Sequence, residues 1–292
     1  MIPRHNIQRV PVQRIGAYPP QRTGAATTDM VAVEEPLEIR LVFYRGNERI
    51  EQSISITMRT PGADYELAAG FLVGEGILHD PDELHEIRYC VDRPGETQQY
   101  NVVSVRLRPG AKPDISRLQR NFYTTSSCGV CGKASLEALQ IQSCPVLPQN
   151  APLIDVQVVR GLEVKLRSAQ AVFGKTGGLH AAALFDAQGA MISAHEDVGR
   201  HNAVDKLIGE QFLAHHLPLS GSVMLVSGRT SFEIMQKALM GGVAVVAAVG
   251  APSSLAIDVA RTYGMTLLGF VRGESFNIYT GAGRIVRAPD SA

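Results

Sequence analysis

The stretch SVMLVSGRTSFEIMQKALMGGVAVVAAVGAPSSLAIDVARTYGMTLLGFVR, residues 222–272, decides the fold class of this chain. Three short apolar segments of strand length alternate with two segments whose apolar residues recur at helical spacing. The strands are SVMLVSG, VAVVAAVG and TLLGFVR, and the helices are TSFEIMQKALMGG and SSLAIDVARTYG. Such alternation predicts a sheet with parallel strands that is covered by helices on both faces.

The residues around this stretch predict the rest of the same domain. Asp155 can cap a helix that runs through VQVVRGLEVKLRSAQAVF. The segments HAAALFD and AMISAHE predict a hairpin, and VGRHNAVDKLIGEQFLAHH predicts another helix. Beyond the stretch, FNIYT predicts an edge strand. Residues 151–292 therefore predict one α/β domain that binds the ligand considered below.

A small α+β domain is predicted over residues 29–150. Residues 37–44 and 50–58 alternate apolar and polar side chains, as half-buried strands do. Asp64 can cap a helix through ELAAGFLVGEGI, and residues 100–108 predict a further strand. A loop that bears two cysteines lies near the end of this domain.

Residues 1–28 predict a flexible tail. The first 25 residues contain four arginines and no acid, and several prolines discourage a helix. They also lack an apolar central segment, so a secretory signal is not expected.

The overall composition excludes several classes of function. Lys plus Arg and Asp plus Glu both number 28, so a zero net charge gives no support to nucleic-acid binding. The longest apolar run, Val243–Val249, is far shorter than the roughly 20 residues of a membrane span. Four cysteines in a chain of 292 residues suggest a reducing compartment, and we expect a cytoplasmic protein.

The most reactive motif is SSCGVCGK, which holds Cys128 and Cys131. The flanking glycines leave both thiols uncovered in a tight turn. A helix is predicted to begin at Lys133, and its amides and this ammonium would favour a thiolate. A thiolate is the form that attacks a donor persulfide, so sulfur transfer fits the motif.

Other interpretations of the cysteine pair stay open. A zinc site needs four ligands as a rule, so Cys90, Cys144, His195 or His201 would have to complete it at unusual spacing. Dithiol–disulfide exchange is a second alternative, although the pair does not follow a strand of a βαβ unit. Two incidental cysteines are a third. The motif alone does not decide among them, and we expect no metal.

Three turns in the second half predict a binding crevice. Ser227–Ser231, Gly250–Ser254 and Val271–Glu274 each follow a predicted strand, and the carboxyl ends of such strands share one edge of the sheet. Helix N-termini at that edge suit phosphate, and Arg229 and Arg272 could contact it. Ser253 could instead simply cap a helix.

The segment HEDVGRHNAVDK, residues 195–206, crowds polar side chains at a predicted strand-to-helix junction. That density suggests a catalytic or partner site, while an N-cap by Asp197 followed by a polar helix face is the plainer interpretation. A zinc-deaminase signature would place a glutamate two residues after a histidine, before a later P-C-x-x-C. Here His195 and Glu196 are adjacent and the cysteine pair comes earlier, so that match fails.

Several long motifs in order resemble the FdhD family of formate dehydrogenase accessory sulfurtransferases. They are MRTPGADYELAAGFLVGEGI, TSSCGVCGK, GGLHAAALFD, HEDVGRHNAVDK, SGRTSFEIMQKA, GAPSSLAIDVA and TLLGFVRGESFNIYT, and they cover nearly everything after the tail. The resemblance implies a carrier that takes persulfide sulfur from a cysteine desulfurase. It then delivers the sulfur to the molybdenum or tungsten bis(guanine dinucleotide) cofactor of formate dehydrogenase.

The resemblance also implies roles for particular residues. Cys128 matches the family's persulfide cysteine, and Cys131 matches its partner. The residues that match the cofactor-binding region are Phe270, Val271, Arg272, Gly273, Glu274 and Ser275. It further implies a homodimer and a three-layer αβα second domain that is similar to cytidine deaminases but without zinc.

Two rival functions remain. One is a chaperone that shelters the cofactor without moving sulfur, and the other is a zinc-dependent nucleotide deaminase.

Overall fold

The computed structural model describes residues 5–13, 27–90, 98–115 and 144–287. Cys128 and Cys131 lie outside these ranges. No helix in the described ranges is both long and apolar enough to span a membrane.

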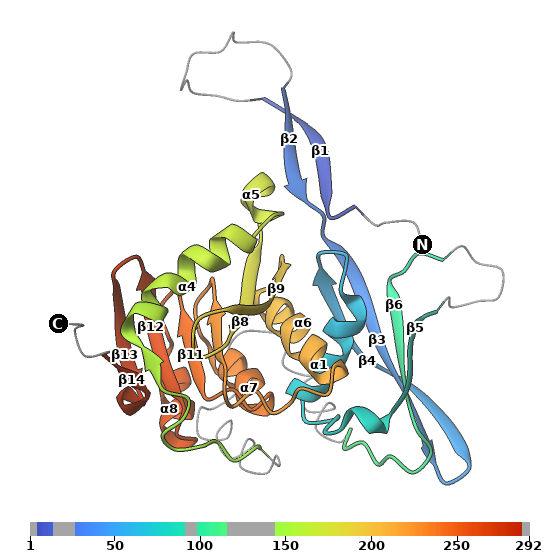
Figure 1. The fold of residues 1–292 in the computed structure, drawn as a ribbon. Coiled ribbons are helices and arrows are strands. Elements are labelled where there is room, and N and C mark those ends of the chain that lie inside the picture. Colours follow the sequence, from blue (N-terminus) through green and yellow to red (C-terminus); the bar gives the residue numbers. More distant parts are fainter. Residues whose placement is uncertain (1–4, 14–26, 91–97, 116–143, 288–292) are drawn as a thin grey trace.

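A six-stranded sheet organises the second half, in the order β13-β12-β11-β10-β8-β9 (Figure 1). The strands are β8 (His180–Phe185), β9 (Met191–Asp197), β10 (Val223–Val226), β11 (Val245–Ala248), β12 (Thr266–Arg272) and β13 (Ser275–Thr280). The central strands β10, β11 and β12 are parallel, while β8 runs antiparallel to β10 and pairs with β9 as a hairpin. These findings confirm the predicted parallel strands, the hairpin and the edge strand.

Helices cover both faces of this sheet. One face packs on α4 (Val156–Ala169), through a buried cluster that contains Leu162, Ala181 and Leu225. The other face carries Ala182 and Met224 and packs beneath three further helices. Those helices are α6 (Arg200–Leu213), α7 (Phe232–Met240) and α8 (Ser254–Thr262). The described C-terminal half is therefore built in three layers. A short parallel pair, β7 (Ile154–Asp155) and β14 (Ile285–Val286), brings the two ends of this half together.

The described residues of the first half form a four-stranded sheet in the order β4-β3-β6-β5, which packs with an α-helix. Its elements are β3 (Glu35–Arg45), β4 (Glu48–Arg59), α1 (Asp64–Gly74), η1 (Pro81–Glu83), β5 (Leu84–Tyr89) and β6 (Val102–Leu107). The β3–β4 hairpin and β6 confirm the predicted strands. Strand β5 was not predicted, because its apolar residues do not alternate cleanly along LHEIRY.

Helix α1 crosses α6 at the closest approach between the two halves. A Cβ on Gly70 would lie 1.9 Å from the Asp205 carbonyl oxygen, and one on Gly209 would lie 1.8 Å from that of Glu66. Both positions must be glycine for the two backbones to touch. A continuous buried cluster therefore runs from the first sheet through these helices to the second. The division at residue 150 stays a prediction.

A hairpin arm extends from the body (Figure 1). Strand β1 (Ile7–Val12) pairs antiparallel with β2 (Thr27–Ala32), so part of the predicted tail has regular structure. Helix α5 (Phe173–Thr176) lies next to β2.

The helix caps test two sequence predictions. Asp155 caps α4, because its carboxylate accepts a hydrogen bond from the amide of Gln157 at 2.6 Å. The predicted cap by Asp64 was wrong, since Ala63 occupies the N-cap position in a left-handed conformation. Asp64 instead lies inside the helix and pairs with the buried Arg59 at 2.9 Å. Asp64 lies inside the helix because its carboxylate there neutralises the buried Arg59 guanidinium.

Candidate functional site

The three predicted turns lie side by side at the carboxyl ends of β10, β11 and β12. The Gly250 amide donates to the Gly228 carbonyl at 3.1 Å, and the Phe270 amide donates to the Gly250 carbonyl at 3.1 Å. Phe270 has a positive φ of 55° and is 42% exposed. A large apolar side chain held at the surface by a strained backbone is typical of a functional edge.

Three helices begin at this same edge. Their N-cap residues are Gly199 for α6, Ser231 for α7 and Ser253 for α8. Only Ser253 satisfies a helix amide with its own side chain, because its hydroxyl accepts from the Ala256 amide at 3.2 Å. The capping interpretation of Ser253 is thus confirmed. The N-cap side chains at the other two helix starts satisfy no helix amide, and a helix N-terminus favours a negatively charged ligand.

A polar cluster of His180, Arg200 and His201 lies beside the first turn. A Cβ on Gly228 would lie 3.4 Å from the His180 ring and 3.8 Å from Arg200 Cδ, so the turn closely approaches both side chains. His201 Nε2 lies 3.4 Å from Ser231 Oγ and 3.9 Å from a Glu233 carboxylate oxygen. We use the name edge cluster for six residues: His180, Arg200, His201, Gly228, Ser231 and Glu233.

Two buried polar atoms at this edge have no hydrogen-bond partner among the described residues. They are Arg200 Nε and the Thr230 hydroxyl, whose side chain is only 1% exposed. Burying such a group without a partner costs about 1–3 kcal/mol. A bound oxyanion would satisfy a guanidinium in this position, and arginine suits phosphate because its N–H groups form a planar fork.

The histidines of the edge cluster are held neutral. Burial lowers the pKa of His201 to about 4, with the nearby Arg200 guanidinium adding to the effect. Burial and the same guanidinium also lower the pKa of His180. Near neutral pH both rings can therefore donate and accept hydrogen bonds, while Arg200 supplies the positive charge.

We expect the ring of His201 to titrate near pH 4, well below the ordinary value of about 6.5. Because the folded pKa is lowered, the unfolded chain takes up this proton first as the pH falls. The stability tied to this ring is then complete above about pH 6.5 and is lost on going down toward pH 4. An NMR titration measures the midpoint, with the resonance assigned by its absence from His201→Asn. A midpoint above pH 6 would contradict the burial argument.

The predicted cofactor residues occupy the same edge but differ in what they can contact. Arg229 and Arg272 are both exposed, and Arg272 Nε donates to the Val249 carbonyl at 3.2 Å. Val271 is fully buried against the α4 layer, so only its backbone faces the edge. Gly273, Glu274 and Ser275 form the exposed turn from β12 into β13, where Glu274 lies 3.4 Å from Arg160. The places of these residues in the fold do not test whether they bind a cofactor, so their role in binding stays a prediction.

The sequence pointed only indirectly to the edge cluster. Arg200 and His201 stood in a segment rich in polar residues, and His180 followed a glycine turn. Residues of three separate segments converge here because β8, β9 and β10 are neighbours in the sheet. A local pattern carries no signal for that convergence.

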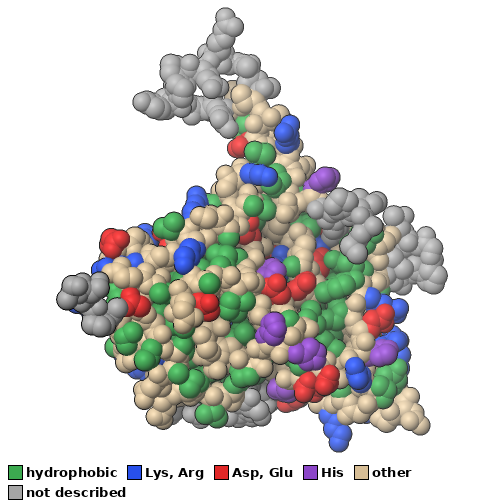
Figure 2. All heavy atoms as spheres, viewed as in Figure 1, with side chains coloured by type: hydrophobic (Ala, Val, Ile, Leu, Met, Phe, Trp, Pro, Cys, Tyr) green, Lys and Arg blue, Asp and Glu red, His purple; other side chains and the backbone are tan. Residues whose placement is uncertain are grey.

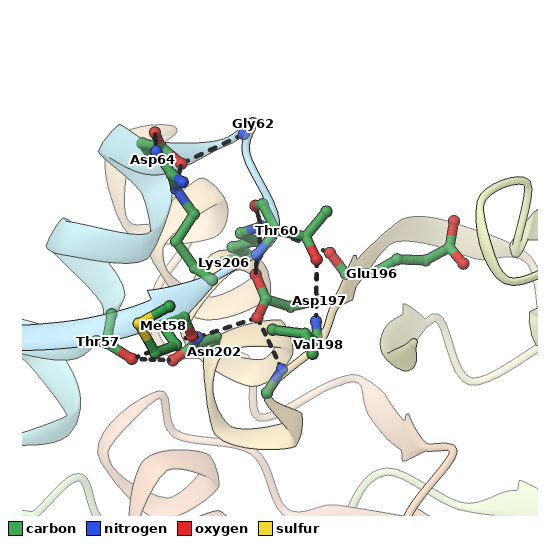
Figure 3. A network of polar contacts seen from close by, with 12 residues as sticks. Thr57, Met58, Thr60, Gly62, Asp64, Glu196, Asp197, Val198, Asn202 and Lys206 are labelled. Atoms are coloured by element: carbon green, nitrogen blue, oxygen red, sulfur yellow. Dashed lines mark hydrogen bonds and ion pairs between the residues drawn. The ribbon is translucent and has the colours of Figure 1, made fainter. Parts of the chain in front are cut away.

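The acidic part of HEDVGRHNAVDK has a structural task (Figure 3). Asp197 is fully buried, and its carboxylate lies 2.7 Å from the Lys206 ammonium. It also accepts hydrogen bonds from the amides of Thr60 and Gly199, at 3.1 and 2.8 Å. The predicted N-cap by Asp197 was wrong, since Gly199 holds that position.

The same network ties β4 to α6. Asn202 donates to the Met58 carbonyl at 2.8 Å and to Asp197 at 3.0 Å, while Lys206 donates to the Thr60 carbonyl at 2.8 Å. The polar groups of these side chains are therefore already occupied by hydrogen bonds that join the two halves. Asp197, Asn202 and Lys206 are consequently poor candidates for contact with a ligand.

No group of three or more histidine, cysteine or acidic side chains in the described ranges could hold a metal ion. Because the cysteine pair lies outside those ranges, the expectation of no metal stays a prediction.

Comparison with known proteins gives consistent matches. A family model described as the FdhD/NarQ family matches residues 32–286. Proteins of Streptomyces avermitilis and Mycobacterium tuberculosis, both named Sulfur carrier protein FdhD, are 52% and 50% identical to this chain. The alignments cover 90% and 88% of this chain and 92% of each relative.

A solved structure shares the fold. The crystal structure of a protein described as a formate dehydrogenase accessory protein, from Desulfotalea psychrophila, matches with a TM-score of 0.69. The match covers 96% of this chain and 98% of the other, at 24% sequence identity.

Proposed function

The chain belongs to the FdhD/NarQ family, and from that premise we propose that it is a sulfur carrier in the maturation of formate dehydrogenase. The names of its relatives support the carrier role, and the accessory-protein description of the solved structure supports the target. As finer parts of the proposal, a cysteine desulfurase is the donor and the location is cytoplasmic. The protein acts as a homodimer, and its second domain is similar in fold to cytidine deaminases.

In the proposed transfer, Cys128 accepts the sulfur. Its thiolate attacks the terminal sulfur of the donor persulfide, a new S–S bond forms, and the donor cysteine leaves as a thiolate. Cys131 assists the second transfer. Both residues lie outside the described ranges, so this step rests on the chemistry of the C-x-x-C motif.

We propose that the sulfur acceptor binds at the carboxyl edge of the second sheet. This substrate is the molybdenum or tungsten bis(guanine dinucleotide) cofactor, whose phosphates are its most strongly charged groups. One observation carries the assignment: the buried Arg200 Nε has no hydrogen-bond partner among the described residues, and it lies at an edge where the N-cap residues of α6 and α7 make no side-chain cap. In this proposal, Arg229 and Arg272, which are both exposed, contact the remaining phosphate oxygens.

Calorimetric titration with GDP tests the location of the site. Arg200→Ala should weaken binding on the order of ten- to a hundredfold, the effect of losing a charge-assisted contact. Arg229→Ala and Arg272→Ala should weaken it less, because those side chains are exposed. The matched control is Arg261→Ala, an exposed arginine of α8 that pairs with Asp258 and should not matter. If the three variants Arg200→Ala, Arg229→Ala and Arg272→Ala bind GDP as tightly as the parent, the edge is not the site.

A cofactor chaperone without sulfur transfer is the second candidate, because the edge cluster involves no cysteine. Mass spectrometry after incubation with desulfurase and cysteine separates the two functions. A gain of one sulfur atom on the peptide CGVCGK supports the carrier. Unmodified thiols in a protein that still binds GDP support the chaperone.

A further inference from the structure

A pocket of about 200 Å³ lies where the two halves of the chain meet. Its lining includes the turn Thr60–Ala63 of the first half and residues of α4, β9 and α6 of the second. Asn6, at the base of the arm, also lines it, as do Val172 and Leu179 from the connection between α4 and β8. We call this space the junction pocket. One of its walls is therefore a connecting segment rather than a strand or a long helix.

Three ionisable residues line the junction pocket. On the face shown in Figure 2, histidine and acidic side chains gather where the two halves meet. Two of the three are paired within the body, since His195 lies 3.0 Å from Glu210 and Lys206 lies 2.7 Å from Asp197. The third, Glu196, points away from the Asp197–Lys206 pair in Figure 3 and bonds to the connecting segment instead.

The connecting segment is accessible along most of its length. Every residue from Ala171 to Gly178 is exposed or half-buried, whereas Gln170 and Leu179 at its two ends are 7% and 4% exposed. We call residues 171–178 the flap. Segments that bury few apolar side chains have low local stability and open at a small cost in free energy.

Glu196 holds the flap at the start of α5. Its carboxylate accepts hydrogen bonds from the amides of Val172 and Phe173, at 2.9 and 2.8 Å. Val172, the N-cap residue of α5, makes no side-chain cap of its own. Hydrogen bonds to an ionised acceptor are stronger than those between neutral groups. The carboxylate from β9 therefore replaces the missing cap and fixes the flap against this strand.

Two further contacts of the flap are weaker. The Arg167 guanidinium lies 4.1 Å from the centre of the Phe173 ring, but Arg167 is exposed, and exposed cation–π contacts contribute little. On the outer side, a Cβ on Gly178 would lie 3.9 Å from Ala32, at the base of the arm that extends from the body in Figure 1. A Cβ on Gly177 would meet no atom within 4 Å, so the flap has space beside it.

We infer that the flap is a gate of the junction pocket and that Glu196 is the latch that holds it closed. Opening breaks the two bonds between the carboxylate and the flap amides, and the flap turns between its buried ends, Gln170 and Leu179. Val172 then leaves the pocket wall, and Ala181, a lining residue that is 3% exposed, becomes accessible. Gates of this kind admit a ligand and then exclude water from it. The inference follows from the contacts of the flap and does not rest on the proposed function.

The test uses the full chain with Ala181→Cys, which places a thiol in the lining of the pocket. Iodoacetamide labels this thiol when the flap opens, and peptide mass spectrometry gives the labelling rate at position 181 alone. Adding Glu196→Gln should raise this rate about tenfold or more, because the side-chain amide keeps one acceptor oxygen and turns N–H groups toward the flap. The matched control is Glu86→Gln, the same change at an exposed glutamate of β5 beside Arg88, and it should leave the rate unchanged.

A second variant opens the flap without a change to the pocket lining. Gly177 has a φ of 67°, a conformation in which alanine is strained. Gly177→Ala should therefore raise the labelling rate at position 181 about five- to thirtyfold. Trypsin should also cut faster after Lys175, an exposed residue of the flap, in both Glu196→Gln and Gly177→Ala.

A cysteine at position 183 separates opening of the flap from loosening of the whole domain. Ala183 lies two residues further along β8 on the same face of the sheet, is fully buried, and lies outside the junction pocket. The thiol of Ala183→Cys should stay unlabelled in the parent, Glu196→Gln and Gly177→Ala backgrounds. Equal labelling at position 181 in these three backgrounds, or a parallel rise at position 183, would overturn the gate.

Discussion

Replacing Cys128 with alanine is expected to abolish activation of the target formate dehydrogenase. The proposed carrier holds sulfur through a covalent bond to this thiol, and no other side chain in the motif except Cys131 can form that bond. The expected loss is therefore complete apart from any bypass through Cys131. Target activity after co-expression measures the effect, and mass spectrometry should find no added sulfur at position 128.

The matched control is Cys90→Ala, which removes a half-buried thiol at the end of β5. This variant should activate the target as the parent does. GDP binding by Cys128→Ala should be unchanged, since the edge cluster involves no cysteine. Normal activation by Cys128→Ala would refute the carrier mechanism and leave the chaperone function.

Replacing Asp197 with alanine should produce the largest loss of stability. Asp197 is fully buried, and its removal leaves the Lys206 ammonium, 2% exposed, without its carboxylate. Breaking a buried ion pair from one side typically costs about 3–5 kcal/mol. The amides of Thr60 and Gly199 lose their acceptor as well. Urea unfolding measures the free energy of unfolding, and a large decrease is expected.

Two controls separate the buried charge from a general effect of the substitution. Asp258→Ala removes an exposed carboxylate, 51% accessible, that lies 3.8 Å from Arg261, and it should change stability by less than about 1 kcal/mol. Asp197→Ala combined with Lys206→Met should recover part of the loss, since no unpaired charge is left inside. A double variant less stable than Asp197→Ala would contradict the ion-pair explanation.

Much of the fold could be predicted because its signals are local. The apolar runs at residues 223–226, 245–248 and 266–272 are strands as predicted, and the intervening periodic segments are helices. Strands β1, β2 and β5 were not predicted, since none of them carries a clear alternation of apolar residues. Pairing between β1 and β2, and between β5 and β6, supplies the missing stabilisation.

The location of the candidate site followed from the same signals, but its chemistry did not. Parallel strands place their carboxyl ends at one edge of the sheet, so the sequence alone predicted that the three turns lie together. Which side chains face that edge depends on neighbours in the sheet. His180 and Arg200 meet Gly228 only because β8 lies next to β10.

The sequence by itself determined the main helices and strands of the second half, their arrangement around parallel strands, and the motifs by which the family is recognised. Only the tertiary structure decided which polar groups are buried, which are hydrogen-bonded and which have a shifted pKa. Asp197 and the Thr60 amide are 137 residues apart in the chain, and they form one buried network that fixes α6 against β4. The Nε2 atom of Gln170 is enclosed by the surrounding segments and has no hydrogen-bond partner in the part of the chain that the structure describes. Apolar periodicity is read within one segment, whereas a hydrogen bond or a shifted pKa depends on which distant groups exclude water around it.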